Sequence, residues 1–448
     1  MIRLGTVADD LTGATTAAAL FARSGVPAIA YWDMDAAERA EPGEKEAVLL
    51  STGSRAMKPE DAYRAVSRAT GILKKLGAEF FQKRIDTTMR GGIGAEIDAM
   101  LDVLGGDYLA VVVPAMPQNH RIVVGGYSLI DGDLLSRTEV RHDVLTPVHE
   151  SFIPRLLSAQ TRRQVAQLTA ECLMQGSDAI AEKLKTLYNH GVRVVVADAV
   201  SMDDIQLIAD TCRRLCVPLL SVDPGPFTAC LLGGGALPAP GMAQPAPRKT
   251  GTVLVAVGST TEHSRRQLDA LCADGKNERL VIRAERFLKD KAERDREVDR
   301  VARAAVSLLE RSEPPRAIVL DGSSVAARFG TKEEQLRNEA HALKGRDPVV
   351  DSLGKILQTV LAASDIRARV AGLYLTGGDT MAAILARLDV QCVRVHDYIV
   401  PQVDLCRLEG GQLDGMLVAS KGGMVGDEKI ALLIVQKILE ESARAGPV

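Results

Sequence analysis

Short runs of apolar residues recur along the chain, and helix-length segments of mixed polarity separate them. In the first half, these runs predict strands at residues 2–8, 28–32, 47–50, 109–113, 193–198 and 217–223. In the second half, they predict strands at residues 252–257, 317–320, 370–375 and 416–419. Strands that alternate with helices indicate βαβ units and parallel sheets. The pattern therefore predicts an α/β protein.

The segments between these strands predict helices at residues 14–24, 59–76, 95–104, 203–216 and 427–443. Residues 285–311 are rich in charge, and we expect a helix with a solvated face there. Residues 118–150 show neither the apolar run of a strand nor the pattern of a helix. We therefore expect an irregular excursion there, with structural or loop histidines. This excursion would be either a lid or a subunit contact, and a subunit contact would make the protein a homodimer.

A stretch rich in proline divides the chain. Four prolines lie within residues 237–249, and such a composition is typical of a semi-stiff linker. The boundary predicts a domain of residues 1–236 and a second of residues 250–448. We expect each domain to hold a largely parallel sheet flanked by helices.

Composition narrows the classes of partner. Aromatic residues make up only 3% of the 448 residues, which favours an aliphatic core and disfavours stacking on single-stranded nucleic acid. The net charge of -3 gives no general attraction for a polyanion. We find no uncharged run of the roughly 18 residues that a membrane span needs. The seven scattered cysteines are typical of reduced thiols. These features predict a cytoplasmic protein that binds neither nucleic acid nor membrane.

Two adjacent carboxylates follow the first predicted strand. Asp9 and Asp10 lie where that strand turns into an alanine-rich helix, and Thr12 is a candidate N-cap for this helix. Open α/β sheets bind ligands at the carboxyl ends of their strands. The position therefore favours a functional role, although one carboxylate could cap the helix while the other is solvated.

Further charged residues lie at turns of the same half. They are the carboxylate of Asp86 and the cations Arg55, Lys83, Arg84 and Arg90. Arginine can hold a carboxylate or a phosphate through two parallel hydrogen bonds, and a carboxylate beside a hydroxyl can act as a base. The combination suits a small, hydroxylated, anionic substrate. The alternative interpretation is a set of structural ion pairs.

Three turns of the second half are built from glycine, serine and threonine. The segment Gly377-Gly378-Asp379-Thr380 precedes a helix and fits a phosphate cradle, and Ser259 could donate to another phosphate oxygen. Lys421 supplies a mobile cation beside a third glycine turn. Together these turns suggest a nucleotide site. The chain lacks the usual P-loop motif, and its first turn is not the Gly-x-Gly-x-x-Gly of an NAD-linked dehydrogenase.

The ordered motifs resemble one known family. Ala8-Asp9-Asp10-Leu11-Thr12-Gly13-Ala14 resembles the Ala-Asp-Asp-Phe/Leu-Thr-Gly-Ala opening of the four-carbon acid sugar kinases. Lys83-Arg84-Ile85-Asp86-Thr87-Thr88-Met89-Arg90-Gly91 is similar to that family's Lys-x-Val-Asp-Ser-Thr-x-Arg-Gly. Ser54-Arg55, Gly258-Ser259, Gly377-Gly378-Asp379-Thr380 and the closing Ser420-Lys421-Gly422-Gly423-Met424-Val425-Gly426 fall in the expected order. The resemblance covers nearly the whole chain.

The resemblance implies that the first domain binds a sugar acid and that the second binds ATP. It implies transfer of the γ-phosphoryl group to a terminal hydroxyl of a tetronate-like acid. By motif, the residues on the substrate side are Asp9, Asp10, Arg55, Lys83, Asp86 and Arg90. The nucleotide residues carried over in the same way are Ser259, Gly377, Gly378, Asp379, Thr380, Gly422 and Gly423.

We expect Asp86 or Asp10 to take the proton of the attacking hydroxyl. Mg²⁺ would bridge the phosphate oxygens, as phosphoryl transfer generally requires, with ligands that the sequence does not identify. Transfer would occur across a cleft between the domains, which the linker would allow to close. D-threonate or D-erythronate is favoured as substrate, with 3-oxo-tetronate or a branched sugar acid as alternatives. A regulator that binds nucleotide without catalysis stays open, because Thr16 and the Ser420-Lys421 order depart from the family pattern.

Overall fold

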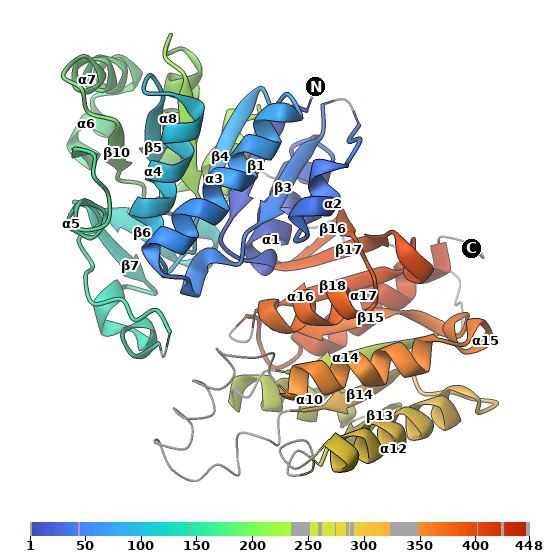
Figure 1. Ribbon diagram of the computed structural model, residues 1–448. Coiled ribbons are helices and arrows are strands. Elements are labelled where there is room, and N and C mark those ends of the chain that lie inside the picture. The colour runs from blue at the N-terminus through green and yellow to red at the C-terminus, as the bar shows by residue number, and fades with distance from the viewer. Residues whose placement is uncertain are drawn as a thin grey trace. The chain divides into compact units, whose positions relative to one another are not determined.

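The chain divides into two compact units, Met1–Ala239 and Pro240–Val448. The computed structural model describes residues 2–43, 45–143, 145–233, 251–258, 262–273, 275–283, 286, 291–322, 348–400, 402–422 and 425–444. The predicted linker, 237–249, lies outside these residues. Figure 1 shows both units as α/β structures, with the first in blue and green.

The first unit contains a parallel sheet with the strand order β2-β3-β1-β4-β11-β5-β10-β9. These strands are β1 Leu4–Ala8, β2 Ala28–Tyr31, β3 Ala47–Ser51, β4 Phe80–Arg84, β5 Leu109–Val112, β9 Val165–Leu168, β10 Val194–Ala197 and β11 Leu219–Asp223. Every residue of β1 and β3 is buried, which requires cover on both faces of the sheet. The parallel α/β class predicted for this half is confirmed.

The helices of the first unit are α1 Leu11–Arg23, α2 Met34–Glu38, α3 Pro59–Lys75, α4 Ile93–Leu104, α5 Ile153–Ser158, α6 Ala170–Met174, α7 Ser177–Asn189, α8 Met202–Arg213 and α9 Pro226–Leu231. Helices α3 and α4 contact each other, and they pack on β1 and β4 respectively (Figure 1). No strand or helix was predicted between residues 150 and 190, yet β9 and α7 form there.

The excursion at residues 118–150 is more regular than expected. It contains a small antiparallel sheet of β6 Arg121–Val124, β7 Tyr127–Ile130 and β8 Asp133–Leu134. The turn residues Gly125 and Gly126 have φ of 59° and 80°, and Asp131 and Gly132 have φ of 53° and 91°. Positive φ at both central residues is typical of two-residue hairpin turns, for which Gly-Gly and Asp-Gly are strong signals. The prediction of an irregular segment was therefore wrong in its first part.

The second unit contains a sheet with the order β13-β14-β12-β15-β18-β17-β16. Its strands are β12 Thr252–Val257, β13 Asn277–Val281, β14 Ala317–Asp321, β15 Val370–Thr376, β16 Cys392–Val400, β17 Val403–Glu409 and β18 Leu417–Lys421. The five strands from β13 to β18 in this order are parallel, whereas β17 and β16 are antiparallel. The prediction of a largely parallel sheet is confirmed.

The helices described in this unit are α10 Glu262–Cys272, α12 Lys291–Leu309, α14 Pro348–Leu361, α15 Ser364–Arg367, α16 Gly378–Arg387 and α17 Ile430–Arg444. Helix α12 lies in the charged region that we expected to be solvated. One of its faces is buried through Val298, Val301, Ala305 and Leu309. Glu297 is also buried, and its Oε1 lies 2.5 Å from Nη2 of Arg300. In the described part of the chain, no helix combines the length and the apolar character that crossing a membrane demands.

Candidate active site

Parallel pairing brings three loops of the first unit to one edge of its sheet. Ala8 at the end of β1 is in register with Ser51 of β3 and with Arg84 of β4. The chain therefore leaves these three strands at the same level. Asp9 and Arg55 follow two of these ends, and the predicted site residues of the first half lie at or near them.

Arg55 connects the carboxylates from different loops. Its Nε donates to Oδ2 of Asp9 at 2.7 Å, and its Nη1 lies 2.8 Å from Oδ2 of Asp10. Its Nη2 lies 3.9 Å from Oδ1 of Asp86. One guanidinium thus joins Asp9 to Asp86, although 77 positions separate them in the sequence.

Arg84 is a second connecting cation, one to which the resemblance assigned no role. Its Nη1 lies 3.1 Å from Oδ1 of Asp9 and 3.2 Å from Oδ1 of Asp10. Gly13 makes room for this guanidinium, because a Cβ atom at residue 13 would lie 1.8 Å from Nη1 of Arg84. The N-cap of α1 is Asp10, whose Oδ1 accepts from the Gly13 amide at 2.8 Å. The prediction of Thr12 as the N-cap was wrong.

Asp86 lies between two arginines. Nε of Arg90 donates to its Oδ2 at 2.7 Å, and the hydroxyl of Thr88 donates to the same oxygen. Nη1 of Arg90 also lies 3.2 Å from Oδ2 of Asp143, which comes from the 118–150 excursion. We call Asp9, Asp10, Arg55, Arg84, Asp86 and Arg90 the Arg–Asp cluster.

The arginines control the ionisation of this cluster. Burial alone would raise the pKa of Asp9, but Arg55, Arg84 and Lys83 lower it to about 2. Burial also opposes ionisation of Asp86, yet Arg55 and Arg90 hold its pKa well below the ordinary value. Three carboxylates and three guanidinium groups make the cluster neutral overall. Asp143 would add one further negative charge.

These shifts predict a loss of stability in acid. A lowered carboxyl pKa stabilises the folded state above the unfolded pKa near 4, and this stabilisation is lost as the pH falls towards the folded pKa of about 2. The Asp9 shift corresponds to about 2 kcal/mol. We expect wild type to melt at a higher temperature than Asp9→Asn at pH 6, and the gap to shrink between pH 4 and pH 2.5. A gap independent of pH would contradict the ion pairing of Asp9.

A pocket of about 610 Å³ adjoins the cluster. Small-molecule sites usually have volumes of about 300–1,000 Å³. Arg55, Met89 and Gly91 line one part of the pocket, and residues 146–150 of the excursion line another. Gly91 has a φ of 94°, and a Cβ atom there would lie 3.1 Å from the backbone oxygen of Arg55. The pocket and the cluster together form a candidate site for a small polar substrate.

Lys83 does not reach this pocket. Its side chain is fully buried, and its Nζ lies 2.8 Å from Oε2 of Glu96 in α4. Neighbouring strand residues point to opposite faces of a sheet, so Lys83 faces away from Arg84. The substrate contact that the resemblance implied for Lys83 is not what this geometry offers.

Glycine turns gather at the carboxyl edge of the second sheet. Val257 of β12 pairs with Thr376 of β15, and Thr376 pairs with Lys421 of β18. Gly258 and Gly377 follow the first two strands. A Cβ atom at Gly258 would lie 2.3 Å from Oγ1 of Thr380, and Gly377 has a φ of 94°. The absence of a side chain at Gly258 thus lets Thr380 of α16 pack closely against this turn. The amides at the N-terminus of α16 favour an anion.

The predicted nucleotide residues are placed as far as the structure describes them. Gly377, Thr380 and Gly422 lie at this edge, with the backbone of Gly378 and Asp379 in the first turn of α16. Ser259 and Gly423 lie outside the described residues.

The prediction of a mobile cation at Lys421 was wrong. Lys421 is buried, and its Nζ donates to the Gly422 oxygen at 2.9 Å. Burial lowers the pKa of Lys421 to about 8.

Two hydroxyls lie at this edge, one in the quoted Ser420-Lys421 motif and one, Thr376, that the sequence did not single out. Thr376 and Ser420 lie near the ends of β15 and β18, and both side chains are buried. Neither hydroxyl oxygen has a hydrogen-bond partner within the described ranges. A buried hydroxyl without a partner costs about 1–3 kcal/mol, so a ligand that pairs with it would gain from the contact.

Gln267 supports the last glycine loop. This residue of α10 is buried, and its Nε2 lies 3.0–3.2 Å from the carbonyl oxygens of Val425, Gly426 and Asp427. Nε2 of His263 lies 2.6 Å from the Gly426 oxygen. Helix α10 thus fixes the backbone at residues 425–427. This role was not predicted, because no local pattern links Gln267 to a loop about 160 positions away.

Removing this support should weaken nucleotide binding. We expect Gln267→Leu to raise the KM for ATP about fivefold with little change in kcat, because each lost hydrogen bond is worth about 1 kcal/mol. Gln358→Leu is a matched control, since Gln358 is an exposed residue of α14 in the same unit. Equal KM values for both variants would contradict the supporting role of Gln267.

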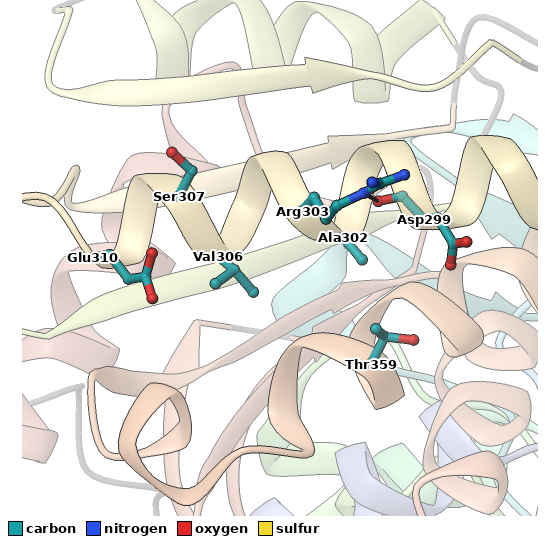
Figure 2. A pocket seen from close by; sticks show the side chains of 7 residues that line it. All are labelled: Asp299, Ala302, Arg303, Val306, Ser307, Glu310 and Thr359. Atoms are coloured by element: carbon teal, nitrogen blue, oxygen red, sulfur yellow. Dashed lines mark hydrogen bonds between the residues drawn. The ribbon is translucent and has the colours of Figure 1, made fainter.

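A second groove, of about 570 Å³, lies along α12. Figure 2 shows Asp299 and Arg303 on this helix and Glu310 just after its end, with Thr359 of α14 opposite. These side chains are exposed, and the groove follows helices rather than the sheet edge where the glycine turns gather. We assign it no role in catalysis.

Comparisons with known proteins match one family model in each unit. Residues 4–231 match the family model for a sugar-binding N-terminal domain, and residues 254–431 match that for a nucleotide-binding C-terminal domain. The D-erythronate kinase of Heliobacterium modesticaldum is 34% identical over 97% of this chain and 96% of its own length. The chain belongs to the four-carbon acid sugar kinase family. It is therefore an enzyme with a nucleotide-binding domain, as the motifs implied.

Other members of the four-carbon acid sugar kinase family are almost as similar. The D-threonate kinase of Bordetella bronchiseptica is 30% identical, with 98% of both chains covered. The 3-oxo-tetronate kinase of Pseudomonas fluorescens is 29% identical, with 94% of both chains covered. A Salmonella typhimurium protein of known crystal structure shares the fold, with a TM-score of 0.77, 22% identity and coverage of 97% of this chain and 99% of its own.

Proposed function

We propose that the enzyme transfers the γ-phosphoryl group of ATP to the terminal hydroxyl of D-erythronate or D-threonate and forms the 4-phosphate. The carrying observation is the Arg–Asp cluster beside a pocket of about 610 Å³ in the sugar-binding unit. Residues 1–236 would bind the acid, and residues 250–448 would bind ATP. The higher identity to a D-erythronate kinase makes D-erythronate the first acid to test.

The cluster offers both kinds of group that a sugar acid needs. Carboxylate oxygens of Asp10 and Asp86 can accept hydrogen bonds from sugar hydroxyls, and Arg55 and Arg90 can hold a carboxylate. Arg90 already binds Asp143 at 3.2 Å. We propose that the substrate carboxylate replaces Asp143 on Arg90. After this exchange, the three arginines and three aspartates of the cluster would contact one substrate anion in place of Asp143.

Asp86 is our first choice for the residue that accepts the hydroxyl proton, and Asp10 is the second. Its pKa lies well below the ordinary value, so Asp86 is ionised but weakly basic at neutral pH. Phosphoryl transfer needs little proton abstraction before the phosphorus–oxygen bond forms, so orientation of the hydroxyl is the main task. The hydroxyl oxygen attacks phosphorus, ADP leaves, and the proton passes to the carboxylate.

The nucleotide phosphates would lie against Gly258, Gly377 and the N-terminus of α16. Mg²⁺ is expected with them, because it normally binds phosphate oxygens and one or two carboxylates. No group of three or more His, Cys, Asp or Glu side chains within the described ranges could hold a metal ion. We therefore propose that Mg²⁺ arrives with ATP, and we assign it no residue. Cytoplasmic location and a homodimer stay predictions.

The test is release of ADP in the presence of a panel of acids. The panel contains D-erythronate, D-threonate, their L-forms, 3-oxo-tetronate and a branched sugar acid, each with ATP and Mg²⁺. We expect release that depends on D-erythronate or D-threonate. Release with 3-oxo-tetronate or the branched acid alone would support the kinase reaction but identify a different substrate. A flat panel with ATP binding intact would contradict catalysis and favour a regulator.

A further inference from the structure

A buried ion pair lies beneath the Arg–Asp cluster. Lys83 of β4 and Glu96 of α4 approach to 2.8 Å, and their side chains are 0% and 1% exposed. A buried pair is weak evidence for stability, because the removal of two charges from water offsets much of their attraction. Stability alone therefore does not account for this pair, and its position next to the cluster suggests another role.

The pair continues into two hydroxyls of the loop after β3. The hydroxyl of Ser54 donates to Oε1 of Glu96, and Oγ of Ser54 lies 2.7 Å from Oγ1 of Thr52. Oγ1 of Thr52 donates to the Ala8 oxygen at 3.0 Å. We call Thr52, Ser54, Lys83 and Glu96 the buried polar network.

Each anchor of this network lies directly before a cluster residue. Ala8 precedes Asp9, and Ser54 precedes Arg55. Nζ of Lys83 donates to the backbone oxygen of Arg84 at 2.8 Å. The network thus links the ends of β1, β3 and β4 at the positions from which the two connecting arginines and Asp9 emerge.

We infer that Lys83 and Glu96 are positioning residues for sugar-acid binding. Their ion pair, extended through Ser54 and Thr52, sets the spacing of the loops that carry Asp9, Arg55 and Arg84. This inference rests on the proposed role of the cluster in binding the acid. A displacement of about 1 Å in such a site can lower activity about 100-fold, so the spacing matters for binding.

The main test is the double variant Lys83→Met with Glu96→Leu, which removes both charges and leaves apolar side chains of similar size. We expect it to fold, because apolar replacements of buried pairs are often neutral for stability. The KM for the acid should rise about tenfold or more, while the Kd for ATP stays within twofold. The matched control is Lys75→Met with Glu38→Leu, an exposed pair of the same unit, which should change neither value.

Ser54→Ala keeps the test decisive if the double variant fails to fold. It removes the hydroxyl that links Glu96 to the Arg55 loop and leaves the ion pair intact. We expect a smaller rise in the KM for the acid, again with ATP binding unchanged. Unchanged KM in Ser54→Ala, or in a folded double variant, would overturn the inference.

Arg55→Gln separates this inference from the proposed function. If Arg55→Gln raises the KM for the acid and the network variants do not, the positioning role fails and the proposed function stands. If Arg55→Gln also leaves the KM unchanged, the proposed role of the cluster itself fails.

Discussion

Replacement of Asp86 by asparagine is expected to lower kcat about 10³-fold, within the range found for loss of a positioned proton acceptor. Asparagine has nearly the same shape, but its amide cannot take the hydroxyl proton. Arg90 and Arg55 would also lose a charged partner at the site. The Kd for ATP should stay within about twofold, because Asp86 lies in the sugar-binding unit. Steady-state kinetics and calorimetric titration with ATP give the two values.

The matched control for this variant is Asp61→Asn. Asp61 is a half-exposed residue of α3 that pairs with Arg64, and its loss should leave kcat unchanged. The kcat of Asp10→Asn shows which carboxylate takes the proton. A larger loss of kcat in Asp10→Asn than in Asp86→Asn would assign the proton to Asp10. A loss of ATP binding in Asp86→Asn would contradict the division of roles between the units. Full turnover in Asp86→Asn would remove it as the proton acceptor.

Gly13→Ala is expected to be one of the most damaging single-methyl changes in the first unit. The added Cβ would lie 1.8 Å from Nη1 and 2.1 Å from Cζ of Arg84. Arg84 is buried and holds both Asp9 and Asp10, so it can move only by breaking these ion pairs. We expect a loss of about 3 kcal/mol in the free energy of unfolding, by overpacking and by unpaired carboxylates. The KM for the acid should rise as well.

Gly71→Ala provides the comparison. Gly71 lies inside α3, and a Cβ atom there would have no neighbour within 4 Å. Alanine is favoured over glycine in a helix, so this variant should gain about 0.5–1 kcal/mol. Thermal melting of both variants measures the contrast. If Gly13→Ala were as stable as Gly71→Ala, the packing of Arg84 against Gly13 would be contradicted.

The fold was largely predictable because its central strands are apolar on both faces. The runs at β1, β5 and β12 bury every residue, so the strand signal is continuous and strong. Shorter or less apolar strands gave weaker signals. Only one residue of β9 is fully buried, and β16 alternates between buried and partly exposed positions. Neither was predicted, because polar or partly exposed positions interrupt the apolar run in both strands.

The candidate site was predictable as a set of charges but not as a geometry. Asp9 and Arg55 could be named because each follows a strand that the sequence reveals, and Asp86 because it lies among cations in a motif. Which cation joins the Arg–Asp cluster depends on the pleat of β4, and that pleat places Lys83 on Glu96 and Arg84 on Asp9. Such pairings join residues that are far apart in sequence, so no local pattern contains them.

The measurement that tests the central claim most directly is the phosphorus NMR spectrum of the products made from D-erythronate and ATP. The account predicts a phosphate monoester whose phosphorus couples to two protons, because the terminal carbon of the acid carries two hydrogens. Coupling to a single proton would place the phosphate on an inner hydroxyl. Inorganic phosphate alone, with ATP consumed and no ester formed, would contradict a kinase acting on this acid.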